Sequence, residues 1–273
     1  MPTRDALLQA YADRRDAFLK QVVADLQTDP RFVAAWLAGS FGRGEADLVS
    51  DLDLHVVVTD DYALSLLVKP LPVWANSTPE RLALLQRFGT PVIVHENHWN
   101  AICEGTFTYC EYADLVKVDW TLMAHAKAIR PHFTRLLFEH SPIPYAPAPQ
   151  PETLEVRKVE LAEQVGYFWL MTASGCKYLI RKDMGEVIRQ FSTVHDVLDE
   201  IERLQRGELA IWGRRYLGKF VVPDADVAAW VQRVRALCAY LVSMYPRIEQ
   251  LIGEPLTPAP TAVIDQLLAL VIE

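Results

Sequence analysis

Residues 36–58 read WLAGSFGRGEADLVSDLDLHVVV. The apolar residues around its start predict a strand over residues 32–38, and its leucine- and valine-rich end predicts a second strand over residues 51–58. Gly39 and Ser40 lie where the first strand ends. A glycine lets the backbone approach a phosphate closely, and a serine can cap a helix whose N-terminal amide groups face an anion. The bend between the two strands therefore indicates a phosphate-binding site.

Two acids lie on one face of the second predicted strand. Side chains two apart in a strand share a face, so Asp51 and Asp53 point the same way while Leu52 and Leu54 point into a core. Two carboxylates this close repel each other unless positive charge lies between them. Mg²⁺ takes oxygen ligands from one or two carboxylates and from substrate phosphates. We therefore expect a metal-binding pair beside the phosphate-binding bend, rather than a solvated acidic turn.

These motifs together resemble those of a known superfamily. The glycine-serine pair, the Arg43-Gly44 that follows and the SDLDL of residues 50–54 are similar to the DNA polymerase β-like nucleotidyltransferases, most of all the bacterial aminoglycoside and lincosamide enzymes. The resemblance implies a nucleotidyltransferase that uses ATP or another nucleoside triphosphate with two Mg²⁺ ions. It implies a small-molecule hydroxyl as the acceptor, with an antibiotic, and hence antibiotic resistance, as one option.

The resemblance also implies a catalytic set of three acids. Asp51 and Asp53 are expected to bind both metal ions. Asp119 lies in a strand predicted over residues 114–123, where alternation places it with Lys117 on the face opposite the apolar side chains. In the superfamily the third acid lies on a strand next to the paired acids, so Asp119 is expected either to complete the metal site or to take the proton of the acceptor hydroxyl.

Binding of the nucleotide is assigned to a second set of residues. Gly39 and Ser40 are expected to hold the β- and γ-phosphates, and Arg43 beside them to contact a phosphate. Lys177 and Arg181 are four apart and therefore share one helix face. Their neighbourhood is similar to a basic helix segment of aminoglycoside 6-adenylyltransferase-like proteins, although a solvated helix face has the same spacing.

The composition narrows the class of protein. The chain has 273 residues, with 51% hydrophobic and 23% charged residues, which fits a globular protein of one large or two ordinary domains. The net charge is −8 and there is no basic block, which argues against a large nucleic-acid-binding surface. No apolar run reaches the ~20 residues that span a bilayer, and the first residues lack a signal-peptide core, so we expect a soluble cytoplasmic protein without membrane partners.

The four cysteines show no C-x-x-C spacing. A zinc site or a disulfide framework is therefore not indicated, and we expect small buried side chains.

A proline-rich stretch, SPIPYAPAPQP at residues 141–151, divides the chain. Prolines at this density exclude a helix interior and a central strand. We expect an α+β protein with an N-terminal mixed β-sheet nucleotidyltransferase domain and flanking helices over residues 1–143. A linker over residues 144–151 and a C-terminal α-helical bundle domain over residues 152–273 follow.

Periodicity and proline positions predict the individual elements. Helices are expected over residues 4–26, 78–88, 154–180, 184–204, 226–244 and 262–272. Residues 62–68 fit a helical turn or a strand. Further strands are expected over residues 91–95 and 106–110, with a turn at residues 111–113, and Pro246 is expected to break a helix. Residues 132–140 resemble the short strand that often follows the third acid in the superfamily.

Three alternatives to small-molecule nucleotidyl transfer remain open. The enzyme could adenylylate a protein, as minimal antitoxin-type nucleotidyltransferases do, although those are shorter. The chain could instead be a catalytically silent nucleotide-binding protein. Arg189 and His195 also have the R-x5-H spacing that resembles the ribonuclease motif of HEPN helical domains, but Gln190 replaces the usual asparagine.

Overall fold

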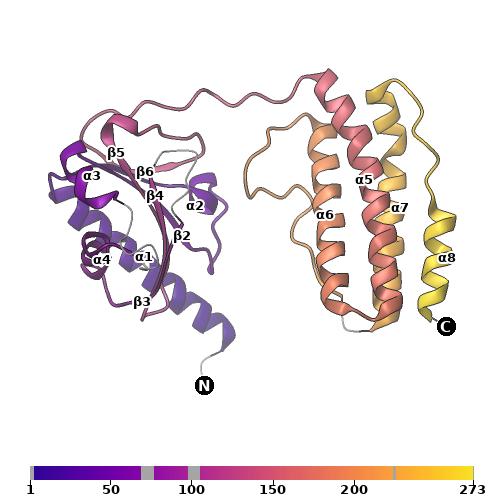
Figure 1. Ribbon diagram of the computed structural model, residues 1–273, viewed down its shortest axis with the longest axis horizontal. Helices are drawn as coiled ribbons and strands as arrows, with labels where there is room; N and C mark the ends of the chain where they lie inside the picture. Colours follow the sequence, from indigo (N-terminus) through magenta and orange to yellow (C-terminus); the bar gives the residue numbers. More distant parts are fainter. Residues whose placement is uncertain (1–2, 69–76, 98–104, 224–225, 273) are drawn as a thin grey trace. The chain divides into compact units, whose positions relative to one another are not determined.

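A computed structural model shows an α+β protein whose chain divides into two compact units, Met1–Ala148 and Pro149–Glu273 (Figure 1). The division falls within the predicted proline-rich linker. The α+β class and the helical C-terminal region predicted from the sequence are confirmed. The structure describes residues 3–68, 77–97, 105–223 and 226–272.

The first unit is built on one mixed sheet. Its described strands lie in the order β3-β4-β5-β2-β1-β6; β2 and β5 are parallel, and the other neighbours are antiparallel. The elements follow in chain order: α1 Arg4–Thr28, β1 Phe32–Leu37, α2 Gly39–Arg43, β2 Leu52–Val58, α3 Asp60–Leu66, α4 Pro79–Gln86, β3 Pro91–Asn97, β4 Thr106–Tyr112, β5 Lys117–Ala124, a 3-10 turn η1 His125–Lys127, and β6 Arg135–Glu139.

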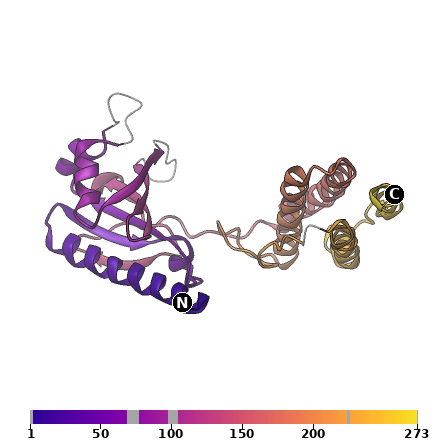
Figure 2. The ribbon, with the colours of Figure 1, turned by 90° about the horizontal axis from the view of Figure 1, so that it is seen from below.

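Alternation along the strands separates a core face from a polar face. Leu52, Leu54 and Val56 of β2 are fully buried on the core face, with Phe18 of α1 and Trp120 of β5 in the same cluster. Figure 2 shows α1 lying along the sheet. The acids of β2 and β5 therefore lie on the other face, as predicted.

The second unit is a bundle of long helices (Figure 1). In α5 Leu154–Arg181, α6 Met184–Arg206 and α7 Val227–Ile252 an acid or threonine caps each N-terminus through its side chain, and α8 Thr261–Ile272 follows. Helix α5 contacts the other three. Phe168, Phe191 and Trp230 lie in the shared core and are 0–1% exposed.

The boundaries differ from the prediction around the third acid. The expected turn at residues 111–113 is wrong, because β4 continues to Tyr112. The strand expected over residues 114–123 begins only at Lys117. Leu115 has φ 71°, and the Tyr112 amide donates to the Val116 carbonyl oxygen (2.9 Å), so the turn closes three residues later.

Pro246 does not break its helix, contrary to expectation: α7 runs through it to Ile252. The proline removes one helix hydrogen bond. However, Met244 and Ile248 on either side are 7% and 0% exposed, and this burial keeps the helix continuous. Residues 62–68, left open between helix and strand, belong largely to α3.

The described cysteines, Cys110, Cys176 and Cys238, are buried and free, as predicted. Cys103 lies outside the described residues.

Two glycines of α5 allow a matched test of the bundle core. A Cβ at Gly175 would lie 2.7 Å from the buried Phe191 ring, whereas a Cβ at Gly166 would meet nothing within 4 Å. We expect Gly175→Ala to lower the free energy of unfolding by about 1–2 kcal/mol through overpacking. We expect Gly166→Ala to raise it by about 0.5–1 kcal/mol through helix propensity. Urea unfolding followed by circular dichroism measures both, and equal effects would contradict the packing shown here.

Candidate functional site

The bend between β1 and β2 brings the backbone against an acid. Gly39 has φ +54°, and a Cβ placed on it would lie 1.8 Å from Asp53 Oδ2. The Ala38 amide donates to the Asp53 carbonyl oxygen (2.9 Å), which fixes the bend to the start of β2. Only glycine allows this approach, because any side chain would occupy the position of the carboxylate.

The expected capping role of Ser40 is wrong. Helix α2 begins at Gly39 with Ala38 as its N-cap, and no side chain caps it. Ser40 is the second residue of the helix, whose first hydrogen bond runs from the Gly42 amide to the Ala38 carbonyl oxygen (2.8 Å). Its proposed contact with a phosphate stays a prediction.

Two strands bring the acids together. Asp53 of β2 pairs directly with Asp119 of β5 in the parallel register, and Asp51 lies immediately before β2. The Asp51 side chain is 37% exposed and that of Asp119 is 9% exposed. The prediction that Asp119 shares a face with the other two acids is therefore confirmed, and a strand register fixes the pairing.

A lysine lies between two of these acids. Lys117 Nζ hydrogen-bonds with Asp51 Oδ2 and lies 3.2 and 3.3 Å from the two carboxylate oxygens of Asp119. Burial opposes the charged amine, but the hydrogen bond to Asp51 and the charges of both acids raise the pKa of Lys117. The ammonium group is thus held charged against Asp51 and Asp119.

The third acid, Asp53, is left with repulsion. Burial first, and then the charges of Asp51 and Asp119, raise its pKa to about 6, although Lys117 and Arg43 act in the opposite direction. Burial also raises the pKa of Asp119, partly offset by Lys117. The cluster therefore carries more negative charge than one lysine compensates.

The donor set suits a hard cation in its chemistry. Three carboxylates supply oxygen ligands of the kind that Mg²⁺ binds, and after burial the negative charges of Asp51 and Asp119 are the causes that raise the pKa of Asp53. Across the described ranges, however, no group of three or more His, Cys, Asp or Glu side chains is already arranged to hold a metal ion. Lys117 contacts two of the three acids instead, so metal binding by Asp51, Asp53 and Asp119 stays a prediction.

The predicted basic residues are found in two places. Arg43, at the end of α2, pairs with Glu45 at 2.7 Å, and its charge reaches Asp53. Lys177 and Arg181 are exposed on α5 of the second unit, where Arg181 lies over the Tyr178 ring at 5.5 Å. Their predicted contacts with a nucleotide stay predictions.

A buried arginine, Arg15, which was not predicted from the sequence, positions the loop before Asp51. Arg15 of α1 is 5% exposed and donates to the carbonyl oxygens of Asp47 and Ser50, both at 2.9 Å. Its position among the apolar residues of an amphipathic helix was the only available signal. Burial of this arginine holds the loop in place and thereby fixes the direction from which Asp51 enters the site.

His55 follows the acids along the same face of β2. His55 pairs across the sheet with Trp36 and Thr121, and its ring stacks on Trp36 at 5.8 Å. Burial lowers the pKa of His55 to about 4, so the ring is neutral. His55 therefore adds bulk and polarity behind the acids without adding charge.

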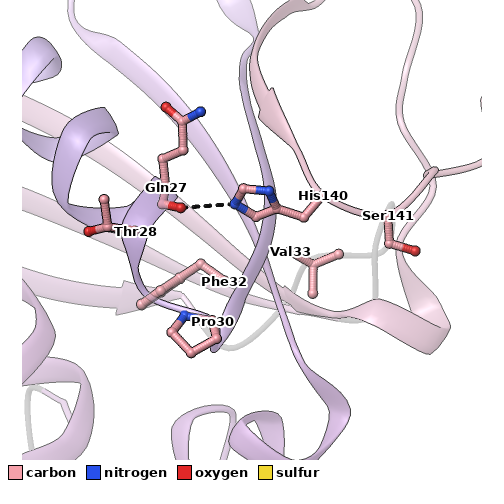
Figure 3. A pocket seen from close by; sticks show the side chains of 7 residues that line it. All are labelled: Gln27, Thr28, Pro30, Phe32, Val33, His140 and Ser141. Atoms are coloured by element: carbon pink, nitrogen blue, oxygen red, sulfur yellow. Dashed lines mark hydrogen bonds between the residues drawn. The ribbon is translucent and has the colours of Figure 1, made fainter.

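The pocket in Figure 3 lies away from the acids. Phe32 in its wall pairs with Val58 at the far end of β2, whereas Asp53 is near the start of that strand. His140 Nε2 donates to the Gln27 carbonyl oxygen across it (2.9 Å). The pocket is lined by Gln27, Thr28, Pro30, Phe32, Val33, His140 and Ser141, and it contains none of the predicted site residues.

The ribonuclease alternative loses support from α6. The Arg189 side chain is 62% exposed and pairs with Glu186, whereas His195 is 5% exposed and packs against Phe220. Burial lowers the pKa of His195. One of the two side chains faces solvent and the other the interior, so they do not form a common site.

Comparison with known proteins adds a distant likeness. An aminoglycoside 6-adenyltransferase from Bacillus subtilis is 12% identical, with a TM-score of 0.36 over 93% of this chain and 97% of that one. A TM-score this low supports no conclusion about this chain. No family model matches the chain, and a search of curated proteins found no similar sequence. The resemblance to nucleotidyltransferases therefore stays a prediction from the motifs.

A helix that crosses a bilayer must be long and apolar along about 20 residues. None of the described helices is long and apolar enough to cross a membrane.

Two glycines of the bend separate backbone strain from contact with Asp53. Gly39 and Gly44 both have positive φ, but a Cβ at Gly44 would meet nothing within 4 Å. We expect Gly44→Ala to lower the free energy of unfolding by about 1 kcal/mol through backbone strain. We expect Gly39→Ala to lower it by at least about 1 kcal/mol more, because it also displaces the carboxylate. Urea unfolding tests this, and equal losses would argue against the close approach.

The raised pKa of Asp53 predicts a pH dependence of stability. The folded state binds the Asp53 proton more tightly than the unfolded state, so its contribution to the free energy of unfolding falls as the pH rises from about 4 to about 6. Without metal, Asp53→Asn should gain about 1–2 kcal/mol relative to the wild type between pH 4 and pH 7, a value reduced for partial solvent exposure.

Urea unfolding over that pH range measures the gain. Asp114→Asn, at an exposed turn, is the control. A gain that is absent, or the same in the control, would contradict the raised pKa of Asp53.

Proposed function

We propose that this chain transfers a nucleoside monophosphate, AMP from ATP, to a hydroxyl of a small-molecule acceptor and releases pyrophosphate. The observation that carries the proposal is the pairing of Asp53 with Asp119 across parallel strands, with Asp51 beside them and a close glycine bend at Asp53. Nucleotidyl transfer depends mainly on positioning and on neutralising phosphate charge. This cluster would supply oxygen ligands for the divalent ions that neutralise that charge.

The acids would hold the metal and receive the proton. Mg²⁺ ions bound by Asp51, Asp53 and Asp119 would neutralise charge on the triphosphate. The acceptor oxygen attacks the α-phosphorus, the bond from that phosphorus to pyrophosphate breaks, and the hydroxyl proton passes to the Asp119 carboxylate. The position of Asp119 directly opposite Asp53 in the strand register supports this assignment, because it places the carboxylate beside the acids that would hold the metal.

The bend would hold the phosphates. Backbone amides at Gly39 and Ser40 are the groups proposed to meet the β- and γ-phosphates, and Arg43 would add positive charge near Asp53. Lys177 and Arg181 are proposed to add charge from the second unit.

A small, cationic acceptor fits the acidic chain better than a nucleic acid does. The net charge is −8, and such a chain would repel a polyanion. An aminoglycoside, a cationic acceptor of the kind that the resemblance of the motifs implies, therefore belongs in a panel of candidate acceptors together with lincosamides.

The test combines nucleotide binding with transfer. We expect calorimetry of ATP with Mg²⁺ to show metal-dependent binding in the wild type. The Asp51→Asn, Asp53→Asn double variant should lose at least tenfold in affinity, because the metal loses two charged ligands. Pyrophosphate release with the acceptor panel should fall at least 100-fold in Asp119→Asn, the range in which a positioned base contributes.

The Lys177→Met, Arg181→Met double variant is measured separately in the same calorimetry, and it tests whether these two residues contribute to ATP binding. Unchanged metal-dependent affinity in the double acid variant would contradict the proposal. Labelled ATP incubated with cell lysate distinguishes the acceptors: label on protein would favour protein adenylylation. Binding without any transfer would favour a silent nucleotide-binding protein.

A further inference from the structure

Lys117 occupies a position that a divalent ion would need. Its ammonium group contacts Asp51 and both oxygens of Asp119. Lys117 and Asp51 are 66 residues apart in the chain, whereas Lys117 and Asp119 are two residues apart on the same strand. An ammonium and a metal cannot share the same carboxylate oxygens at contact distance. One cation therefore excludes the other from these two acids.

The surroundings of Lys117 offer it a second position. Its side chain is 36% exposed, so it is not locked in place by packing. Glu111 of β4 lies directly opposite in the strand register, and the Tyr109 ring is 6.0 Å from Nζ. A carboxylate and an aromatic face both attract an ammonium group.

We propose that Lys117 is a resident cation that competes with the divalent ion for Asp51 and Asp119, and that it moves toward Glu111 and Tyr109 when the ion binds. This inference rests on the proposed metal site. With all three acids ionised, the three carboxylates and the Lys117 ammonium carry a net charge of −2. Without the ammonium the net charge is −3, which attracts a divalent ion more strongly. Lys117 keeps the site from closing around a metal before the nucleotide arrives with its own negative charge.

Binding of Mn²⁺ without nucleotide, measured from the free-ion signal in electron paramagnetic resonance, tests the competition. Removal of the competing charge should let Lys117→Met bind Mn²⁺ at least tenfold more tightly than the wild type. Lys117→Arg keeps a cation and should stay within threefold of the wild type. Lys20→Met removes a lysine from an exposed position of α1 and is the control for net charge, with affinity within twofold of the wild type.

Glu111→Gln tests the second position. With Lys117 present, loss of its alternative partner should weaken Mn²⁺ binding at least threefold. In the Lys117→Met background the same substitution should have a smaller effect, so the two changes are coupled. A rise in melting temperature on addition of Mg²⁺, larger in Lys117→Met than in the wild type, gives a second measurement that does not depend on activity.

The outcomes separate this inference from the proposed function. Suppose that Lys117→Met binds Mn²⁺ no more tightly than the wild type, while the single variant Asp53→Asn abolishes binding. This result would overturn the competition but would still support the metal site. No Mn²⁺ binding in the wild type or in Lys117→Met would overturn both. Equal effects of Glu111→Gln in the two backgrounds would overturn the second position of Lys117.

Discussion

The parallel pairing of β2 with β5 is the constraint on which the site depends. It places Asp53 opposite Asp119, and it leaves the apolar residues of both strands on the other face, against α1 and the buried Trp120. A shift of one residue in this register would turn one set of acids into the core. Burial of Leu52, Leu54 and Val56 therefore holds the carboxylates together as firmly as any direct contact does.

Charge repulsion and hydrophobic burial are opposed in this cluster. Burial of Asp53 first, and then the charges of Asp51 and Asp119, raise the pKa of Asp53, and Lys117, which contacts the other two acids, offsets this only in part. Regions where packing keeps like charges together are common at functional sites, because the strain is released when a ligand of opposite charge binds. The stability of the first unit is therefore linked to the ionisation of Asp53.

Much of this arrangement could be predicted from the sequence, because the period of a strand is local. Alternation alone placed Asp51 and Asp53 on one face and Asp119 on a polar face. It could not decide whether Lys117 faces solvent or acids, since that depends on which strands pair. Arg15 was missed for the same reason: its partners lie in a loop more than 30 residues away. Pro246 shows the other limit, in which core packing overrides a local preference.

The order of the strands in the chain has a consequence for biosynthesis. Asp51 and Lys117 are separated by 66 residues, and β3 and β4 lie between them in the sequence. Closing so long a loop is slow compared with forming a local hairpin. A nascent polypeptide that has left the ribosome only through β4 already carries Asp51 and Asp53 but no neighbouring strand to complete the cluster. The half-made protein therefore lacks both the Asp53–Asp119 pair and the contact of Lys117 with Asp51, and both form only after β5 has emerged.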